Sequence, residues 1–118
     1  MSSDIKEEFM KEREILNDIV MRYADLSIKR FYNLDSKVYE EGALSRKVKE
    51  LIGLVASLVL RCDDCIKYHV VRCFEEGITD DEFTEAVAIA LVVGGSITIP
   101  HVRRAFKDWD EMKKEVSG

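Results

Sequence analysis

The sequence contains little of what β-rich or nucleic-acid-binding proteins need. Its 118 residues include one proline and six glycines, too few turn-forming residues for a small β-barrel with many short strands. Lys and Arg together number 18 against 23 Asp and Glu, and the formal net charge is −5. Phosphate backbones and acidic membrane surfaces are bound through basic side chains. We therefore expect neither a nucleic acid nor a membrane as partner.

Long hydrophobic segments are also missing from the sequence. The two longest apolar stretches, residues 51–60 and 86–95, have ten residues each, whereas a membrane-spanning helix needs about 20. Residues 1–8 lack the apolar segment that is typical of a secretion signal. These features predict a cytoplasmic protein. In that reducing compartment a close cysteine pair is more often catalytic or metal-binding than a structural disulfide.

Helical periodicity is the main pattern that the sequence does contain. Apolar residues recur at spacings of three and four among charged ones. Ser45 and the pair Thr79 and Glu82 have the pattern of helix N-caps, and Gly42 and Gly77 mark helix ends. We predict one all-α domain over residues 1–118. It is a bundle of five to six helices over residues 4–22, 26–39, 45–60, 63–76, 79–93 and 100–114.

Two of these helices carry more apolar surface than one small domain can cover. Residues 51–60 and 86–93 include no charged side chain, and a helix that is apolar all round must be covered all round. Five or six short helices can hardly enclose both. We therefore expect copies of the same chain to cover the remaining surface in a homo-oligomer. A tightly packed monomer is the alternative.

Cys62, Cys65 and His69 form the most informative motif, a C-x-x-C pair with a histidine four residues after its second cysteine. Residues three or four apart share one face of a helix. The two sulfurs could therefore form a disulfide, and the His69 imidazole could accept the Cys65 thiol proton. The thiolate is the nucleophilic form of cysteine, and a helix that starts near Asp63 would favour it further through the helix dipole.

Three interpretations of this motif are open from the residues alone. The first is structural, with two small apolar cysteines beside a hydrogen-bonded histidine. The second is a metal site with Cys73 as fourth ligand, but Cys62 and Cys73 would lie about 16 Å apart along a helix, and zinc–ligand bonds measure about 2.0–2.3 Å. We expect no metal and no cofactor. The third is a redox-active cysteine pair, which we favour because two sulfurs and a base lie within eight residues.

The sequence around this motif resembles a known family. Glu50, the Cys62–Cys65–His69 motif, residues 77–79 and the glycine pair 94–95 resemble the alkylhydroperoxidase D-like branch of the carboxymuconolactone decarboxylase family. The motif-bearing core covers about residues 44–106. The resemblance implies an all-α fold, a homo-oligomer (trimer or hexamer) and thiol-dependent reduction of a hydroperoxide.

The resemblance also implies a role for each site residue. Cys65 would be the peroxidatic thiol and Cys62 the resolving one, Glu50 and His69 would relay the proton, and an external dithiol of dihydrolipoyl type would restore the pair. In one straight helix Glu50 and His69 would lie about 28 Å apart. We therefore predict an antiparallel hairpin that reverses near residues 61–63, with an offset that a glutamate side chain and one water could bridge.

Some features of the sequence oppose this assignment. Asp63 and Asp64 place two carboxylates beside the thiols, which disfavours a thiolate. The helix dipole would favour Cys62 as the attacking thiol, whereas the spacing to His69 favours Cys65.

Two alternatives for the whole protein stay open, namely a non-redox decarboxylase-like enzyme that acts on a lactone acid and a non-catalytic oligomeric helical module. Elsewhere we expect Cys73 to be a buried core thiol and His101 to lie at the surface or in a cap.

Overall fold

The computed structural model describes residues 4–117, and all regular structure in that range is helical. It confirms the predicted all-α fold, with the following elements: α1 (Ile5–Tyr23), α2 (Leu26–Val38), α3 (Arg46–Leu60), α4 (Asp63–Glu75), α5 (Asp80–Gly94), the short 3-10 helix η1 (Ser96–Thr98) and α6 (Ile99–Ser117). Within the same range, no helix combines the length and the apolar character needed to cross a bilayer.

The helices begin at the polar residues that the sequence offers as N-caps. The Ser45 hydroxyl accepts the Val48 N–H of α3. At the start of α5, the Thr79 hydroxyl accepts the Glu82 N–H, while the Glu82 carboxylate accepts the Thr79 N–H. Each cap satisfies backbone donors that have no partner inside the helix. These two predicted helix starts are therefore confirmed.

Glycines and a 3-10 turn set the helix ends on the C-terminal side. Gly77 after α4 and Gly95 after α5 have φ values of 78° and 80°, a conformation that costs a glycine little. Between α5 and α6 the buried Thr98 donates its hydroxyl to the Gly95 carbonyl at 2.8 Å. The last helix therefore starts at Ile99, one residue before the predicted start at residue 100.

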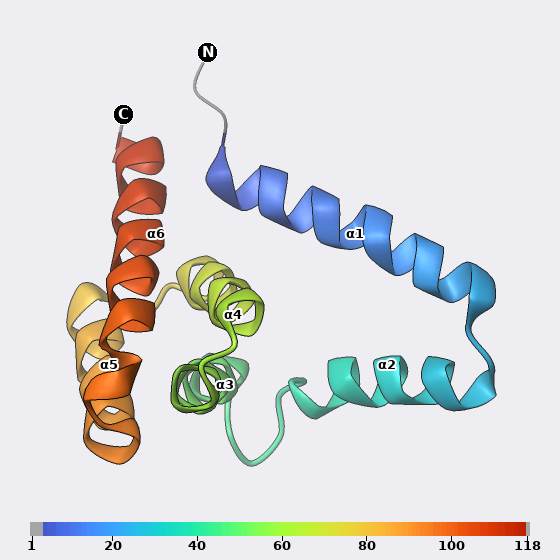
Figure 1. The fold of residues 1–118 in the computed structure, drawn as a ribbon, viewed down its shortest axis with the longest axis horizontal. Coiled ribbons are helices and arrows are strands. Elements are labelled where there is room, and N and C mark those ends of the chain that lie inside the picture. Colours follow the sequence, from blue (N-terminus) through green and yellow to red (C-terminus); the bar gives the residue numbers. More distant parts are fainter. Residues whose placement is uncertain (1–3, 118) are drawn as a thin grey trace.

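Helices α3 to α6 pack together and form the core of the structure (Figure 1). Helix α3 lies between α4 and α5, and α4 also packs against α6. The Phe83 ring of α5 stacks on the Trp109 ring of α6 with 4.3 Å between the centroids, and the Trp109 indole N–H donates to Asp80. The fully enclosed apolar side chains include Leu54, Leu58, Val70, Cys73, Phe83 and Ala90. We call α3 to α6 "the core" below.

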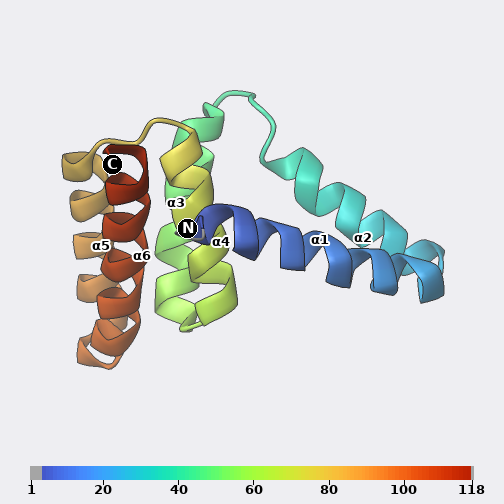
Figure 2. The ribbon, with the colours of Figure 1, turned by 90° about the horizontal axis from the view of Figure 1, so that it is seen from above.

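Helices α1 and α2 project away from the core, as both ribbon views show (Figures 1 and 2). Neither helix contains a buried residue. The start of α1 is attached to the core, where the Ile5 N–H donates to Glu115 and Lys6 pairs with Glu75. The apolar stripe predicted on the first helix therefore forms, but much of it stays exposed in this chain. We call α1 and α2 together "the arm".

Candidate active site

The chain reverses direction between α3 and α4, as predicted for residues 61–63. Arg61 has a φ of 58° and a ψ of 42°, the left-handed conformation, and its N–H donates to the last turn of α3. The Cys62 N–H donates to the Ser57 carbonyl at 3.2 Å. These two residues close α3 with a tight turn. The result is an antiparallel hairpin that places Glu50 of α3 beside His69 of α4.

Cys62 and Cys65 form a disulfide at the first turn of α4, with 5.3 Å between their Cα atoms. Cys62 is the N-cap residue of the helix, and its sulfur accepts the Cys65 N–H at 3.3 Å. Cys65 is exposed, whereas Cys62 is partly buried. The pair can thus close a disulfide, as the three-residue spacing suggests, and Cys65 presents its side chain to solvent.

Glu50 and His69 form a buried pair one turn further along α4. Only 1% of Glu50 is exposed, and its carboxylate accepts the His69 Nδ1–H at 2.9 Å. The contact is direct, so the water that we expected between the two side chains is not needed. Arg72 also approaches Glu50, with 3.5 Å between its Nε and the second carboxylate oxygen. The buried carboxylate therefore has partners on both oxygens, as a buried charge requires.

Tyr39 completes this cluster, although no motif in the sequence indicates it as a site residue. It is the residue that ends α2, and its hydroxyl lies 3.4 Å from His69 Nε2. Gly53 of α3 provides the space for both rings. A Cβ atom on Gly53 would lie 2.5 Å from His69 Cε1 and 2.8 Å from the Tyr39 hydroxyl. An isolated glycine inside a helix is the one sequence signal that could have pointed to this close approach.

The carboxylates next to the cysteines have different surroundings. Asp63 accepts a hydrogen bond from His101 Nδ1 at 2.6 Å and pairs with Arg104 at 3.2 Å. These two partners, His101 first, hold the pKa of Asp63 below its usual value. His101 thus links α6 to the start of α4, which is a more specific role than the surface or cap position we predicted. Of the two carboxylates expected to disfavour a thiolate, the one on Asp63 is therefore balanced by His101 and Arg104.

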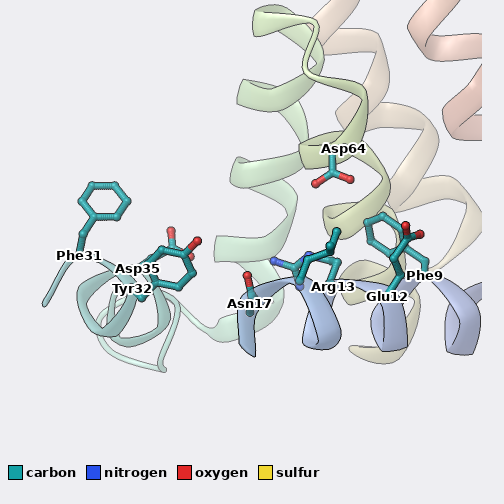
Figure 3. Close-up of a pocket in the computed structure, with 9 residues that line it drawn as sticks. Phe9, Glu12, Arg13, Asn17, Phe31, Tyr32, Asp35 and Asp64 are labelled. Atoms are coloured by element: carbon teal, nitrogen blue, oxygen red, sulfur yellow. The ribbon is translucent and has the colours of Figure 1, made fainter. Parts of the chain in front are cut away.

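Asp64 instead lines a pocket between α4 and the arm (Figure 3). The pocket has a volume of about 440 Å³. In Figure 3 the Asp64 carboxylate lies above Arg13, while aromatic side chains stand along the walls. The lining includes Phe9 and Arg13 from α1, Phe31, Tyr32 and Asp35 from α2, and Asp64 from α4. A small organic molecule could therefore approach the first turn of α4 from the arm side.

Cys73, the third cysteine, is part of the core. It is fully buried, and this burial, together with the Glu50 charge, raises the pKa of its thiol to about 12. A buried neutral thiol behaves as a small apolar side chain. Among residues 4–117, no three His, Cys, Asp or Glu side chains are grouped so that they could hold a metal ion.

Comparisons with known proteins agree with this geometry. The model of the carboxymuconolactone decarboxylase family matches residues 27–108. A family member from Thermotoga maritima, described with a suggested involvement in antioxidative response, is 56% identical. Its crystal structure has a TM-score of 0.89, and the match covers 93% of each chain.

Two more distant relatives extend the comparison. Uncharacterized protein 4 in the cox locus of Paracoccus denitrificans is 30% identical over 82 residues, which are 70% of this chain and 74% of that protein. A carboxymuconolactone decarboxylase family protein from Legionella pneumophila shares the fold, with a TM-score of 0.81 and 23% identity over 93% of this chain and 98% of that one. The family match spans more than two thirds of the sequence and includes the whole α3–α4 hairpin, so this chain belongs to the carboxymuconolactone decarboxylase family.

Proposed function

We propose that this protein reduces hydroperoxides with the Cys62–Cys65 pair and is regenerated by an external dithiol. The observation that carries the proposal is the disulfide at the exposed start of α4, one turn before a buried histidine–glutamate pair. A nucleophilic thiol, a resolving thiol and a base are the groups that thiol-dependent peroxide reduction needs. The suggested antioxidative role of the Thermotoga maritima relative points in the same direction.

The first step of the proposed reaction is activation of Cys65. The Glu50 carboxylate holds the proton of His69 on Nδ1, so the lone pair of the imidazole is on Nε2. In the reduced protein the Cys65 proton moves to Nε2, one helical turn away. The thiolate then attacks a peroxide oxygen and the O–O bond breaks. Cys65 becomes a sulfenic acid, and the departing alkoxide takes the proton from His69 to form an alcohol.

Resolution and regeneration follow by thiol chemistry. The Cys62 sulfur attacks the sulfenic acid of Cys65, water leaves, and the disulfide forms. An external dithiol, of dihydrolipoyl type by family analogy, then attacks the exposed Cys65 sulfur. Cys62 leaves as a thiolate at the N-cap of α4, where its sulfur already accepts the Cys65 N–H. A positively polarised helix start stabilises that leaving group. Two exchange steps return both thiols and release the oxidised dithiol.

A peroxide-consumption assay with a supplied dithiol tests the proposal. We expect wild-type protein to turn over and Cys65→Ser to have no activity above background. Glu50→Gln keeps the shape of the side chain but weakens the relay, so we expect a loss of about 100-fold or more. Cys73→Ala is the matched cysteine control and should retain activity. Unchanged turnover in Cys65→Ser would reject the mechanism. Turnover of a lactone acid by the Cys62→Ser/Cys65→Ser double variant would favour the non-redox alternative.

We also propose that the protein works as a homo-oligomer whose apolar surfaces are covered by copies of this chain. Ten large apolar side chains on the arm are well exposed: Ile15, Leu16, Ile19, Tyr23, Leu26, Ile28, Phe31, Tyr32, Leu34 and Val38. If each side chain exposes on the order of 100 Å², their combined apolar area exceeds the largest apolar patch of a typical monomer, which is about 300–600 Å². Their sum is comparable with the roughly 800 Å² that each partner contributes to a stable interface.

A second apolar surface lies on the core itself. Helices α3 and α5 form a groove of about 650 Å³ with Leu51, Ile52, Val55 and Ile89 among its walls. Two different apolar surfaces on one chain suit head-to-tail contacts, which close into a ring. Light scattering should therefore give a mass of three or six times 13.6 kDa, and Phe31→Glu should lower it. A monomer at micromolar concentration would contradict this assembly.

A further inference from the structure

Tyr39 has a position that the proposed reaction does not explain. It ends α2, where the arm joins the segment leading to the core, and it is partly buried. Its hydroxyl lies 3.4 Å from His69 Nε2, with 5.4 Å between the ring centroids. Gly53 leaves room for the contact, because a Cβ there would lie within 2.8 Å of both His69 Nε2 and the Tyr39 hydroxyl. The contact thus depends on three separate elements, α2, α3 and α4.

The direction of this hydrogen bond follows from the partner on the other side of the imidazole. The Glu50 carboxylate can only accept, so the single proton of a neutral His69 imidazole lies on Nδ1, and Nε2 keeps its lone pair. The Tyr39 O–H must then donate to Nε2. Partial burial, followed by the charges of Glu50 and Asp35, raises the pKa of Tyr39. The phenol therefore remains protonated and able to donate at neutral pH.

The same nitrogen is the one that would accept the Cys65 proton. Nε2 of a neutral imidazole has one lone pair, so a hydrogen bond from Tyr39 competes with one from the Cys65 thiol. In the disulfide form both ring nitrogens of His69 are occupied, Nδ1 by Glu50 and Nε2 by Tyr39. The base must therefore release Tyr39 before it can take a proton from Cys65.

We propose that Tyr39 is a positioning residue that holds the lone pair of His69 while Cys62 and Cys65 are oxidised and competes for it with the Cys65 thiol after reduction. This inference rests on the proposed function, because it takes His69 as the acceptor of the Cys65 proton. Tyr39 thereby lowers the resting reactivity of the reduced thiol. It links the position of the arm to the chemistry of the core.

The other groups around His69 supply a matched control. His69 contacts Glu50 from α3, Tyr39 at the end of α2 and Tyr68 on α4. Arg72 of α4 approaches Glu50, and Arg13 of α1 stacks over the Tyr68 ring at 3.9 Å. The Tyr68 ring lies 5.2 Å from the His69 ring, edge-on. In the described residues its hydroxyl makes no hydrogen bond to His69. Removing the Tyr68 hydroxyl should therefore leave the Nε2 lone pair unchanged.

The test is the alkylation rate of Cys65 by iodoacetamide in the reduced, full-length protein as a function of pH. A Cys62→Ser background leaves Cys65 as the one reactive thiol, because Cys73 is buried with a pKa of about 12. The serine hydroxyl can also cap α4. We expect Tyr39→Phe to raise the rate at pH 7 about threefold or more and to move the pH midpoint downward. Tyr68→Phe should follow the Cys62→Ser parent.

The outcomes separate this inference from the proposed function. If Cys65 is alkylated no faster in Tyr39→Phe than in Tyr68→Phe, the role of Tyr39 is overturned, even if the wild type consumes peroxide. A faster rate without any peroxide consumption would support Tyr39 and reject the peroxidase. A second measurement needs no variant. Nitrogen-15 NMR of the oxidised wild type should show neutral His69 with its proton on Nδ1, and a proton on Nε2 would overturn the inference.

Discussion

The core and the arm are both built from helices with apolar faces, yet the fully buried side chains lie in the core and none lies in the arm. In the core, Phe83 is fully buried and Glu50 is 1% exposed. In the arm, where neither helix contains a buried residue, Phe31 is 68% exposed. Helical periodicity indicates which face is apolar, but it does not say which surface covers that face. In the core much of that cover comes from the same chain, and we propose that other copies cover the arm and the groove between α3 and α5.

The two regions also contribute differently to the site. The core supplies the groups that need fixed positions, because the α3–α4 hairpin holds Glu50, His69 and the disulfide. The arm supplies Tyr39 and one side of the pocket beside Asp64. This division suits a site whose proton relay is rigid and whose access and resting reactivity depend on how the arm lies.

The largest expected difference is between two phenylalanines. Phe83→Ala removes a ring that is buried and stacked on Trp109, so we expect a loss of about 3–5 kcal/mol in the free energy of unfolding. Phe31→Ala should cost less than about 0.5 kcal/mol in dilute protein, and more at high concentration if copies cover the arm. Urea unfolding at several protein concentrations measures both. Equal losses at low concentration would contradict the distinction between core and arm.

The three cysteines should differ strongly in reactivity. Burial raises the pKa of Cys73 to about 12, so only roughly one part in ten thousand would be thiolate at pH 8. Mass spectrometry after reduction and alkylation of the folded protein should find label on Cys62 and Cys65, with Cys73 at least 100-fold slower. Denaturant should remove the difference. Rapid native labelling of Cys73 would show that the core around it opens.

Gly53→Ala tests the fit between α3 and the site. In an open helix this change would stabilise by about 1 kcal/mol, but here the new Cβ would lie 2.5 Å from the His69 ring. We expect a net loss of about 1–3 kcal/mol from overpacking, together with altered Cys65 alkylation. Gly42→Ala is the control, since its Cβ would have Lys49 Nζ at 3.7 Å as its nearest neighbour. A neutral Gly53→Ala would mean that His69 and Tyr39 move aside easily.

Asp63→Asn should have the smallest effect. His101 and Arg104 lower the pKa of Asp63. Its contribution to the free energy of unfolding is therefore present above the unfolded-state pKa and is lost as the pH falls through the lower folded-state pKa. Because the group is mostly exposed, the difference between wild type and variant should stay below about 1 kcal/mol near neutral pH. It should shrink as the pH falls below the ordinary pKa of an aspartic acid. Thermal unfolding across this range checks it, and a difference that grows with acid would contradict the pairing.

Local signals in the sequence predict much of the fold. Ser45 and Thr79 cap helices because their side chains bond to N–H groups only three residues away. The reversal near Arg61 follows from the family resemblance together with distance, since the resemblance pairs Glu50 with His69 and the two cannot meet along one helix. Contacts between distant segments leave no such pattern. The hydrogen bonds from Tyr39 to His69 and from His101 to Asp63 join residues 30 and 38 positions apart.

Counting free thiols before and after one equivalent of peroxide tests the central claim most directly. Reduced wild-type protein should lose two thiols per chain and gain one Cys62–Cys65 disulfide. Cys62→Ser should instead stop at an oxidised Cys65 that can be trapped as a sulfenic acid, while Cys73 stays free. An unchanged thiol count in the wild type, under conditions in which a small-molecule dithiol is oxidised, would contradict the assignment of this cysteine pair as a peroxide-reducing centre.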